Sequence, residues 1–170
     1  MNKIKLVGIS TVSLVVAGVL VLAFYFLSSQ SGVSGVESQK CLATNTGYEF
    51  CVDPELLKQL TGEEMQASDG DFQKEVFDFG AISASTIYYT DLTKKQEHIL
   101  LSVFLFPAEK FDAAANPNEP PRFGQEVIRT DGKVLSVAGP TDAMFEPSSQ
   151  DGMNITALYE LMYDAKSWQK

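Results

Sequence analysis

Residues 98–106, HILLSVFLF, form the most apolar stretch of the chain beyond residue 27. The stretch is too short to cross a bilayer as a helix, which takes about 20 residues. Its apolar residues are also too continuous for a strand with one face in water. A run of this kind is typical of a strand that is buried on both faces. We therefore predict a central β-strand here, around which the rest of the domain is arranged.

Further strands are predicted on the N-terminal side of this segment. Residues 73–79 (QKEVFDF) and 83–90 (SASTIYYT) are predicted as two strands separated by a bend near Gly80. Nearer the N-terminus, residues 48–52 (YEFCV) alternate so that the two aromatic residues and the valine share one face. This alternation predicts a half-buried strand at the beginning of the domain.

The segment after the central strand contains a hairpin signal. Asp131-Gly132 separates residues 124–130 from residues 133–138, and both flanking segments contain β-branched residues. Asp-Gly between such segments favours a two-residue hairpin turn. Residues 139–147 (GPTDAMFEP), which follow, are predicted to form an ordered loop.

A short helix is predicted over residues 54–60. Asp53 supplies a capping carboxylate and Pro54 suits the first helical position. Gly62 is expected to end the helix. The polar residues 63–71 are then predicted as a loop.

Two more helices are predicted toward the C-terminus. One is a short helix over residues 107–115, which begins with a proline and is ended by the sequence NPNEPP of residues 116–121. Residues 154–166 repeat apolar residues at three- and four-residue steps, which indicates a buried stripe of Ile155, Leu158, Met162 and Ala165. The element order shows no regular alternation of strand and helix. We therefore predict an α+β domain, in which helices pack on an antiparallel sheet.

The N-terminal residues 6–27 carry no charge and are long enough to span a membrane. As a helix they would extend about 33 Å, compared with about 30 Å for the hydrocarbon core. Lys3 and Lys5 precede this segment, and no basic residue follows until Lys40. The positive-inside rule then places residues 1–5 in the cytoplasm. We predict a single-pass signal anchor in the cell membrane with an extracytoplasmic C-terminal domain.

A cleaved signal peptide is the alternative interpretation of residues 6–27. The segment exceeds the usual apolar length of about 7–15 residues, and Ser29-Gln30-Ser31 is the nearest candidate cleavage site. Both interpretations export the remaining chain. Residues 28–40 (SSQSGVSGVESQK) are rich in serine and glycine and are predicted as a flexible tether of roughly 20 Å. Residues 41–170 are then the folded domain.

The exported part of the chain is strongly acidic. All 22 acidic residues and 11 of the 13 basic residues follow Leu27, which gives this part a net charge of −11. Such a surface disfavours nucleic acid and anionic lipid headgroups. It is compatible with basic partners or cationic ligands, and it also simply promotes solubility.

Two cysteines, Cys41 and Cys51, fall in the exported domain. That compartment permits disulfides, so we predict a disulfide between them. Closing the short loop would stabilise the domain by about 2–3 kcal/mol. The alternative is one buried thiol and one incidental thiol. Their spacing does not match a CxxC redox motif or a zinc site.

The segment Tyr48-Glu49-Phe50-Cys51-Val52-Asp53-Pro54 resembles the aromatic-x-aromatic strand and proline that open Mog1/PsbP-like domains. The hairpin, loop and C-terminal helix that follow have the order found in that family. The resemblance covers most of residues 41–168 as a pattern of elements. It implies an antiparallel sheet with helices on both faces, and a binding or scaffolding role.

The loop of residues 139–147 is the predicted site for a ligand or partner. Its candidate residues are Thr141, Asp142, Met144 and Phe145, because loops held by a rigid scaffold often carry binding residues. Met144 and Phe145 could equally pack beneath the last helix as part of the core.

Two other groups of residues contain side chains that could take part in chemistry. His98 is the single histidine and would have to serve any Ser-His-Asp or Cys-His arrangement, although no G-x-S-x-G motif accompanies it. Asp69, Asp71 and Glu75 resemble a fragment of a calcium loop but supply at best half of the oxygen ligands that the ion requires. We therefore expect no catalytic residues, no metal and no cofactor.

These observations favour a non-enzymatic, membrane-anchored binding or scaffolding module that acts on an envelope protein or a small ligand. One alternative is a structural subunit of a membrane complex, whose anchor would pack through small residues such as Gly8 and Gly18. A hydrolase with an unusual site that includes His98 is the other alternative.

Overall fold

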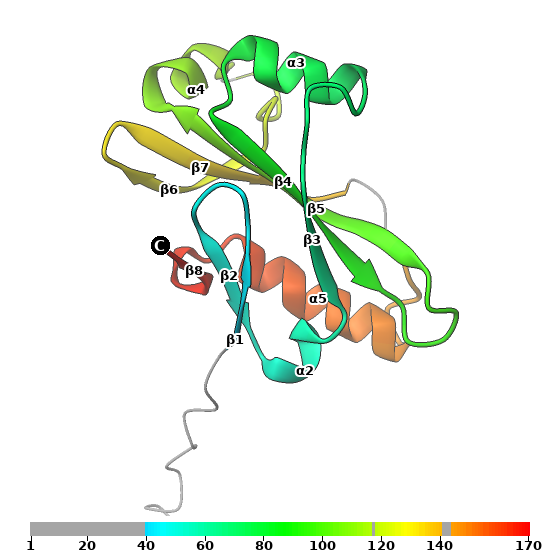
Figure 1. Ribbon diagram of the computed structural model, residues 1–170. Helices are drawn as coiled ribbons and strands as arrows, with labels where there is room; N and C mark the ends of the chain where they lie inside the picture. The colour runs from blue at the N-terminus through cyan, green and yellow to red at the C-terminus, as the bar shows by residue number, and fades with distance from the viewer. Residues whose placement is uncertain (1–39, 117, 141–143) are drawn as a thin grey trace, which may run out of the picture. The chain divides into compact units, whose positions relative to one another are not determined.

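The computed structural model describes residues 40–116, 118–140 and 144–170. They form two antiparallel sheets with helices packed on them, so the predicted α+β class is confirmed (Figure 1). The prediction of one sheet was wrong.

The smaller sheet has the order β1-β2-β8 and contains β1 (Lys40–Ala43), β2 (Glu49–Val52) and β8 (Trp168–Gln169). The larger sheet has the order β3-β4-β5-β7-β6 and contains β3 (Leu60–Glu64), β4 (Ser83–Thr90), β5 (Glu97–Pro107), β7 (Lys133–Ala138) and β6 (Gln125–Thr130).

Strand β5 lies at the centre of the larger sheet, as predicted from its apolar sequence. Its side chains alternate between two separate cores. Leu101, Val103 and Leu105 point into one core, whereas Phe104 and Phe106 point into the other. All five are buried, which confirms a strand that is covered on both faces.

Different helices and strands pack over the two cores. The first, called here the α5 core, lies under α5 (Gln150–Met162) and the smaller sheet, and includes Phe50, Leu158 and Trp168. The second, called here the aromatic core, lies under α3 (Asp71–Phe79) and α4 (Ala108–Ala114). Its buried members are Met65, Val76, Ala84, Phe104, Phe106 and Phe123.

Helix α3 occupies the segment for which the sequence predicts the strand 73–79, and that prediction was wrong. Phe72, Val76 and Phe79 recur at steps of four and three residues, which suits one face of a helix. The segment 73–79 omits Phe72 and so shows an apparent alternation instead. Gly80, at φ +115°, ends the helix in a left-handed conformation, which explains the bend predicted there.

The helix predicted over residues 54–60 is shorter than expected. Helix α2 (Pro54–Leu57) is capped by Asp53, whose carboxylate accepts a hydrogen bond of 2.7 Å from the Glu55 N–H. Leu60 already belongs to β3, and Gly62 lies within that strand rather than ending a helix. A Cβ atom at Gly62 would stand 3.4 Å from the Ala43 carbonyl oxygen, an ordinary contact distance, so β1 lies close to β3 at this position. The predicted loop over residues 63–71 therefore begins two residues too early.

The later elements follow the predictions more closely. Strands β6 and β7 form the expected hairpin, with Asp131 and Gly132 at φ +52° and +70°. The helix predicted over residues 107–115 is α4.

The C-terminal helix begins four residues before the predicted start. The Ser149 side chain caps it by accepting a hydrogen bond of 3.0 Å from the Gly152 N–H. The apolar stripe that located this helix has no member in its first turn, so the pattern gave too late a start. Ile155, Leu158 and Met162 are buried as predicted. Ala165 is exposed in the short 3₁₀ helix η1 (Ala165–Ser167), so its assignment to the stripe was wrong.

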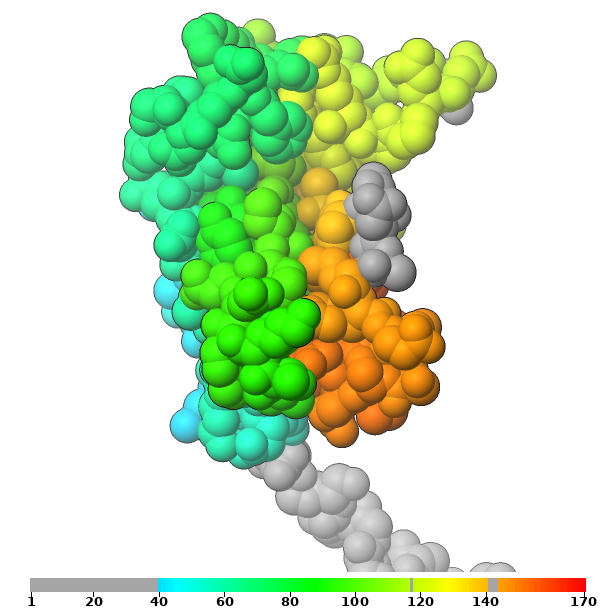
Figure 2. Space-filling model, turned by 90° about the vertical axis from the view of Figure 1, so that its right-hand side faces the viewer, coloured from blue at the N-terminus to red at the C-terminus, as the bar shows by residue number. Residues whose placement is uncertain are grey.

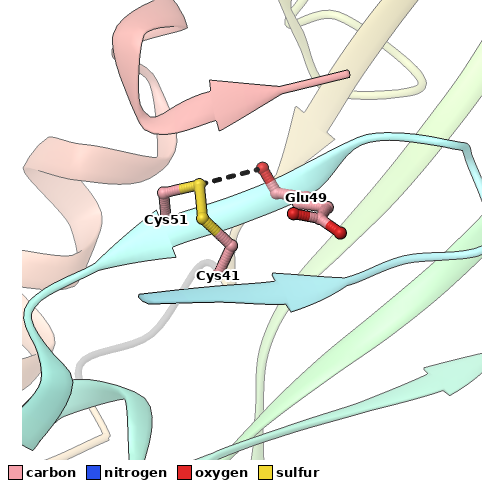
Figure 3. Close-up of a disulfide and its surroundings, with 3 residues drawn as sticks. All are labelled: Cys41, Glu49 and Cys51. Carbon is pink, nitrogen blue, oxygen red and sulfur yellow. Dashed lines mark hydrogen bonds between the residues drawn. A yellow bond between two sulfur atoms is a disulfide. The ribbon is translucent and has the colours of Figure 1, made fainter. Parts of the chain in front are cut away.

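Cys41 and Cys51 form the predicted disulfide between β1 and β2 (Figure 3). The two residues are direct partners in the register of the two strands, with their Cα atoms 4.0 Å apart. The Cys51 sulfur also lies 3.8 Å from the Glu49 carbonyl oxygen, but a disulfide sulfur has no proton to donate. Strand β1 begins at Lys40, one residue inside the predicted tether.

The helices of the described residues are all too short or too polar to span a membrane. The predicted anchor, residues 6–27, lies outside the described part of the chain.

Candidate functional site

An open groove with a volume of about 350 Å³ lies between α4 and the segment that leads into β6. Its lining is mainly apolar and comes from Phe111, Ala114, Ala115, Asn116, Glu119, Pro121, Arg122, Phe123, Gly124, Gln125 and Glu126. The segments of residues 115–116 and 118–122, yellow-green in Figure 2, project from the body of the domain. Apolar grooves of this size that carry a few polar groups are typical of small-ligand sites.

The groove begins where α4 ends, at Ala114. Ala115 adopts an extended conformation, and the sequence that follows has prolines at positions 117, 120 and 121, which disfavour continuation of the helix. The chain returns to the sheet at Gly124, where φ is +78°. A Cβ atom at Gly124 would lie 2.3 Å from the Val137 carbonyl oxygen, so this turn requires glycine.

The inner wall of the groove rests on the aromatic core. The Phe123 side chain is 1% exposed, and its ring centroid lies 4.9 Å from that of Phe79 and 5.2 Å from that of Phe106. The Phe123 carbonyl oxygen accepts a hydrogen bond of 2.8 Å from the Ser136 hydroxyl. These contacts fix one wall of the groove, while half-buried Phe111 supplies the other.

Arg122 links the groove to α3. Its Nη2 lies 2.7 Å from Oε1 of Glu75, and its guanidinium lies over the Phe123 ring at 5.4 Å from the centroid. Both charged side chains are roughly half exposed, so solvent weakens the pair. The guanidinium thus lies within reach of both the Glu75 carboxylate and the aromatic wall.

A second charged cluster lies beside the groove on β6. Arg129 donates to Asp112 of α4, with Nη2 2.7 Å from Oδ1, and to Glu126, with Nε 3.0 Å from Oε1. Glu126 and Asp112 raise the pKa of Arg129, and Arg129 lowers the pKa of Asp112. The arginine therefore stays charged while it is shared between two carboxylates.

The predicted site in the loop of residues 139–147 is described in part. Thr141 and Asp142 lie outside the described residues. Met144 and Phe145 are half-buried and pack against the α5 core. Figure 2 shows this end of the molecule, where the region around the β4–β5 turn, in green, lies beside the beginning of α5, in orange.

Phe145 connects this loop to two strands of the larger sheet. Its ring meets Tyr89 and His98 edge-on, with centroid distances of 5.9 Å and 5.0 Å. Both pairs are close to perpendicular, an arrangement that aromatic rings favour. Phe145 thus packs its loop against the larger sheet.

His98 is paired with Asp91, at 3.2 Å between Nε2 and Oδ2. Burial alone would raise the pKa of Asp91, but hydrogen bonds from the Lys94 backbone, His98 and two further backbone N–H groups outweigh it and lower the pKa to about 2. The carboxylate therefore organises the β4–β5 turn. Among the described residues, the hydrogen bonds of the His98 ring reach Asp91 and no serine, threonine or cysteine.

Tyr89 and Asp151 form a buried polar contact next to this turn. The Tyr89 hydroxyl donates to Oδ1 of Asp151 at 2.7 Å, and the Leu92 N–H donates to the same oxygen at 3.0 Å. The Asn154 side-chain amide donates to the Tyr89 hydroxyl at 3.0 Å. Burial, followed by the Asp151 hydrogen bond, raises the pKa of Tyr89 to about 12. These bonds join the first turn of α5 to β4.

The residues of the partial calcium motif do not converge. Asp69 accepts a hydrogen bond of 2.7 Å from the Gln66 N–H, Asp71 begins α3, and Glu75 binds Arg122. Within residues 40–116, 118–140 and 144–170, no three histidine, cysteine, aspartate or glutamate side chains cluster so as to hold a metal ion.

The groove was not predicted from the sequence. Its signals were present in the proline-rich interruption after α4 and in the phenylalanines on either side of it, Phe111 and Phe123. Such a pattern also fits an ordinary loop, so it does not separate a hollow from a filled turn.

Comparison of the chain with protein-family models, curated proteins and solved structures gives no match. The assignment of function therefore depends on the geometry of the chain itself.

Proposed function

We propose that this chain is a membrane-tethered, extracytoplasmic binding module that holds a small, mainly apolar ligand in the groove between α4 and β6. The groove carries the proposal, because an apolar hollow beside rigid aromatic packing gives a ligand both surface and shape. The proposed resemblance to Mog1/PsbP-like domains fits such a binding role.

Two features support the proposed extracytoplasmic location of the folded domain. Lys3 and Lys5 precede the uncharged residues 6–27, which favours a cytoplasmic N-terminus. The Cys41–Cys51 disulfide suits an oxidising compartment. A short tether would keep the domain, and any ligand in the groove, close to the membrane surface.

The ligand proposal is tested with a neutral aromatic probe, 1-naphthalenemethanol. Equilibrium dialysis of the full chain in lipid nanodiscs should show saturable binding beyond the uptake of the probe by empty discs. Ala115→Trp should abolish that binding, because residue 115 is exposed, extended and lines the groove.

Ala113→Trp is the matched control. Residue 113 is an exposed position of α4 that is not part of the groove lining, so its variant should bind like the parent. Equal melting temperatures would show that both variants are folded. Binding that survives Ala115→Trp, or no saturable binding by the parent, would contradict the proposed site.

The topology is tested in sealed membrane vesicles of known orientation. In vesicles whose extracytoplasmic face is outside, added protease should digest the domain. In vesicles whose cytoplasmic face is outside, the membrane should protect the domain from the protease. The intact mass of the membrane-bound chain distinguishes an anchor from a signal peptide cleaved near Ser31. A domain that is protected from the extracytoplasmic side would refute the proposed location.

A further inference from the structure

We propose that the groove selects aromatic amines in their protonated form, in which an apolar ring carries a single positive charge on a short side chain. This inference rests on the proposed function, since it names the ligand class of the same groove. It assigns the ring to the apolar walls and the ammonium group to the carboxylates at the rim.

The walls favour a flat apolar body. Phe111 and Phe123 line the groove together with Ala114 and Pro121, and the Phe123 ring is held in place by its neighbours in the aromatic core. An aromatic ring can therefore pack against fixed aromatic surface. The small side chain of Ala114 leaves the space that such a ring needs.

The arginine in the lining does not favour an anion. Arg122 is already bound to Glu75 through both Nε and Nη2, at 2.9 Å and 2.7 Å from Oε1. Its positive charge is thus matched by a carboxylate from α3. An anionic ligand would have to compete with Glu75 for the guanidinium.

The remaining charges in the groove lining and in the cluster beside it have a negative surplus. Asp112 and Glu126 share the single guanidinium of Arg129. Glu119 adds another exposed carboxylate to the lining. An ammonium group at the mouth would therefore meet uncompensated negative charge, and the net charge of −9 for the whole chain adds to the attraction.

The size of this selectivity is limited by solvent. The carboxylates are exposed, and pairs of exposed charges contribute little individually. We expect the cation to bind about fivefold more tightly than an anion of the same shape. The contact of the ammonium group with a nearby ring face would add to this preference.

The experiment compares two probes with the same ring, 1-naphthylmethylammonium and 1-naphthoate, at pH 7. Equilibrium dialysis uses the full chain in nanodiscs of uncharged lipid, and the groove-filled Ala115→Trp variant corrects for uptake by the lipid. The ammonium probe should bind about fivefold more tightly. Glu119→Gln should reduce this ratio by about twofold, and a high salt concentration should reduce it further.

Glu160→Gln is the control for the overall charge of the domain. Glu160 is exposed on α5 and is not part of the groove lining, so this variant should keep the parent ratio. Equal binding of both probes, or an equal loss of selectivity in the two variants, would overturn the inference while leaving an apolar groove intact. Failure of both charged probes and of the neutral alcohol to bind would instead overturn the proposed function.

Discussion

The two faces of the larger sheet are covered in different ways. The α5 core lies beneath the longest described helix and the disulfide-linked smaller sheet, and it includes the buried contact between Tyr89 and Asp151. The aromatic core lies beneath two shorter helices, α3 and α4, whose charged contacts are at the surface. This second arrangement leaves an open groove beside its core.

On the proposed function, we expect this difference to separate stability from binding. Long elements with buried polar contacts exclude solvent and fix one arrangement of the chain. Short helices whose ion pairs with the rest of the chain are exposed leave apolar surface within reach of a ligand, since such pairs contribute little to stability. We therefore expect changes in the α5 core to act on stability, and changes near the groove to act on binding.

Truncation of Trp168 should have the largest effect. Its ring stacks on Phe50 at 4.7 Å, and its indole N–H donates to the Met162 carbonyl oxygen at 3.0 Å. Trp168→Ala should lower the free energy of unfolding by about 3–5 kcal/mol, measured by chemical denaturation. Phe111→Ala, in the half-buried wall of the groove, should cost less than half as much. Similar losses of unfolding free energy in the two variants would contradict the proposed difference between the two faces of the larger sheet.

Loss of the disulfide should have the next largest effect. Cys41 and Cys51 are separated by 10 positions, and closing a loop of this length stabilises a protein by about 2.5 kcal/mol in the chain-entropy treatment. The double variant Cys41→Ser/Cys51→Ser should therefore unfold at a lower denaturant concentration. Reduction of the parent should lower its stability to that of the double variant, and a reducing agent should not affect the variant itself.

The sequence allowed the prediction of those elements whose local pattern had no competitor. Strand β5 is apolar along most of its length, and the Asp131-Gly132 turn requires two positive φ values that few other dipeptides tolerate. Helix α3 was missed because Phe72 was left out of the pattern, which made the helical repeat resemble an alternation. The third strand of the smaller sheet, β8, depends on the pairing of Trp168 with Phe50, residues far apart in the chain, which no local pattern encodes.

The candidate site was less predictable than the fold. Phe145 was recognised as a residue that either binds a partner or packs in the core, and its contacts with Tyr89 and His98 place it against the sheet. The groove depends on how the turn at Gly124 places Phe123 relative to Phe111. A hollow is the space that side chains leave empty, so it follows from tertiary packing and not from the residue types alone.

Removal of the Tyr89 hydroxyl should produce a smaller loss of stability. Tyr89→Phe leaves Asp151 with one fewer donor and Asn154 without its acceptor, which should cost about 1–2 kcal/mol. The pKa of Tyr89 is raised to about 12, so the folded protein holds this proton more tightly than the unfolded chain does. The hydroxyl therefore stabilises the fold below pH of about 10, and that contribution is lost as the pH rises through about 12.

The Tyr89→Phe variant tests whether the Tyr89 hydroxyl causes this pH dependence. The difference in the free energy of unfolding between the parent and Tyr89→Phe should shrink as the pH is raised from 9 to about 12. A difference that is independent of pH in this range would mean that the hydroxyl does not carry the effect.

Breaking the Arg122–Glu75 pair should have the smallest effect on stability. Glu75→Gln should change the free energy of unfolding by about 0.2–1 kcal/mol, since both side chains are roughly half exposed. The same substitution frees the positive charge of Arg122 at the groove, so it should weaken the preference for the ammonium probe over the carboxylate probe. Lys58→Gln, which removes an exposed charge from the pair that Lys58, just after α2, makes with Glu55, should change neither the groove nor its selectivity. A large loss of stability in Glu75→Gln would show that the aromatic core depends on its surface charges, and the two faces of the sheet would then be alike.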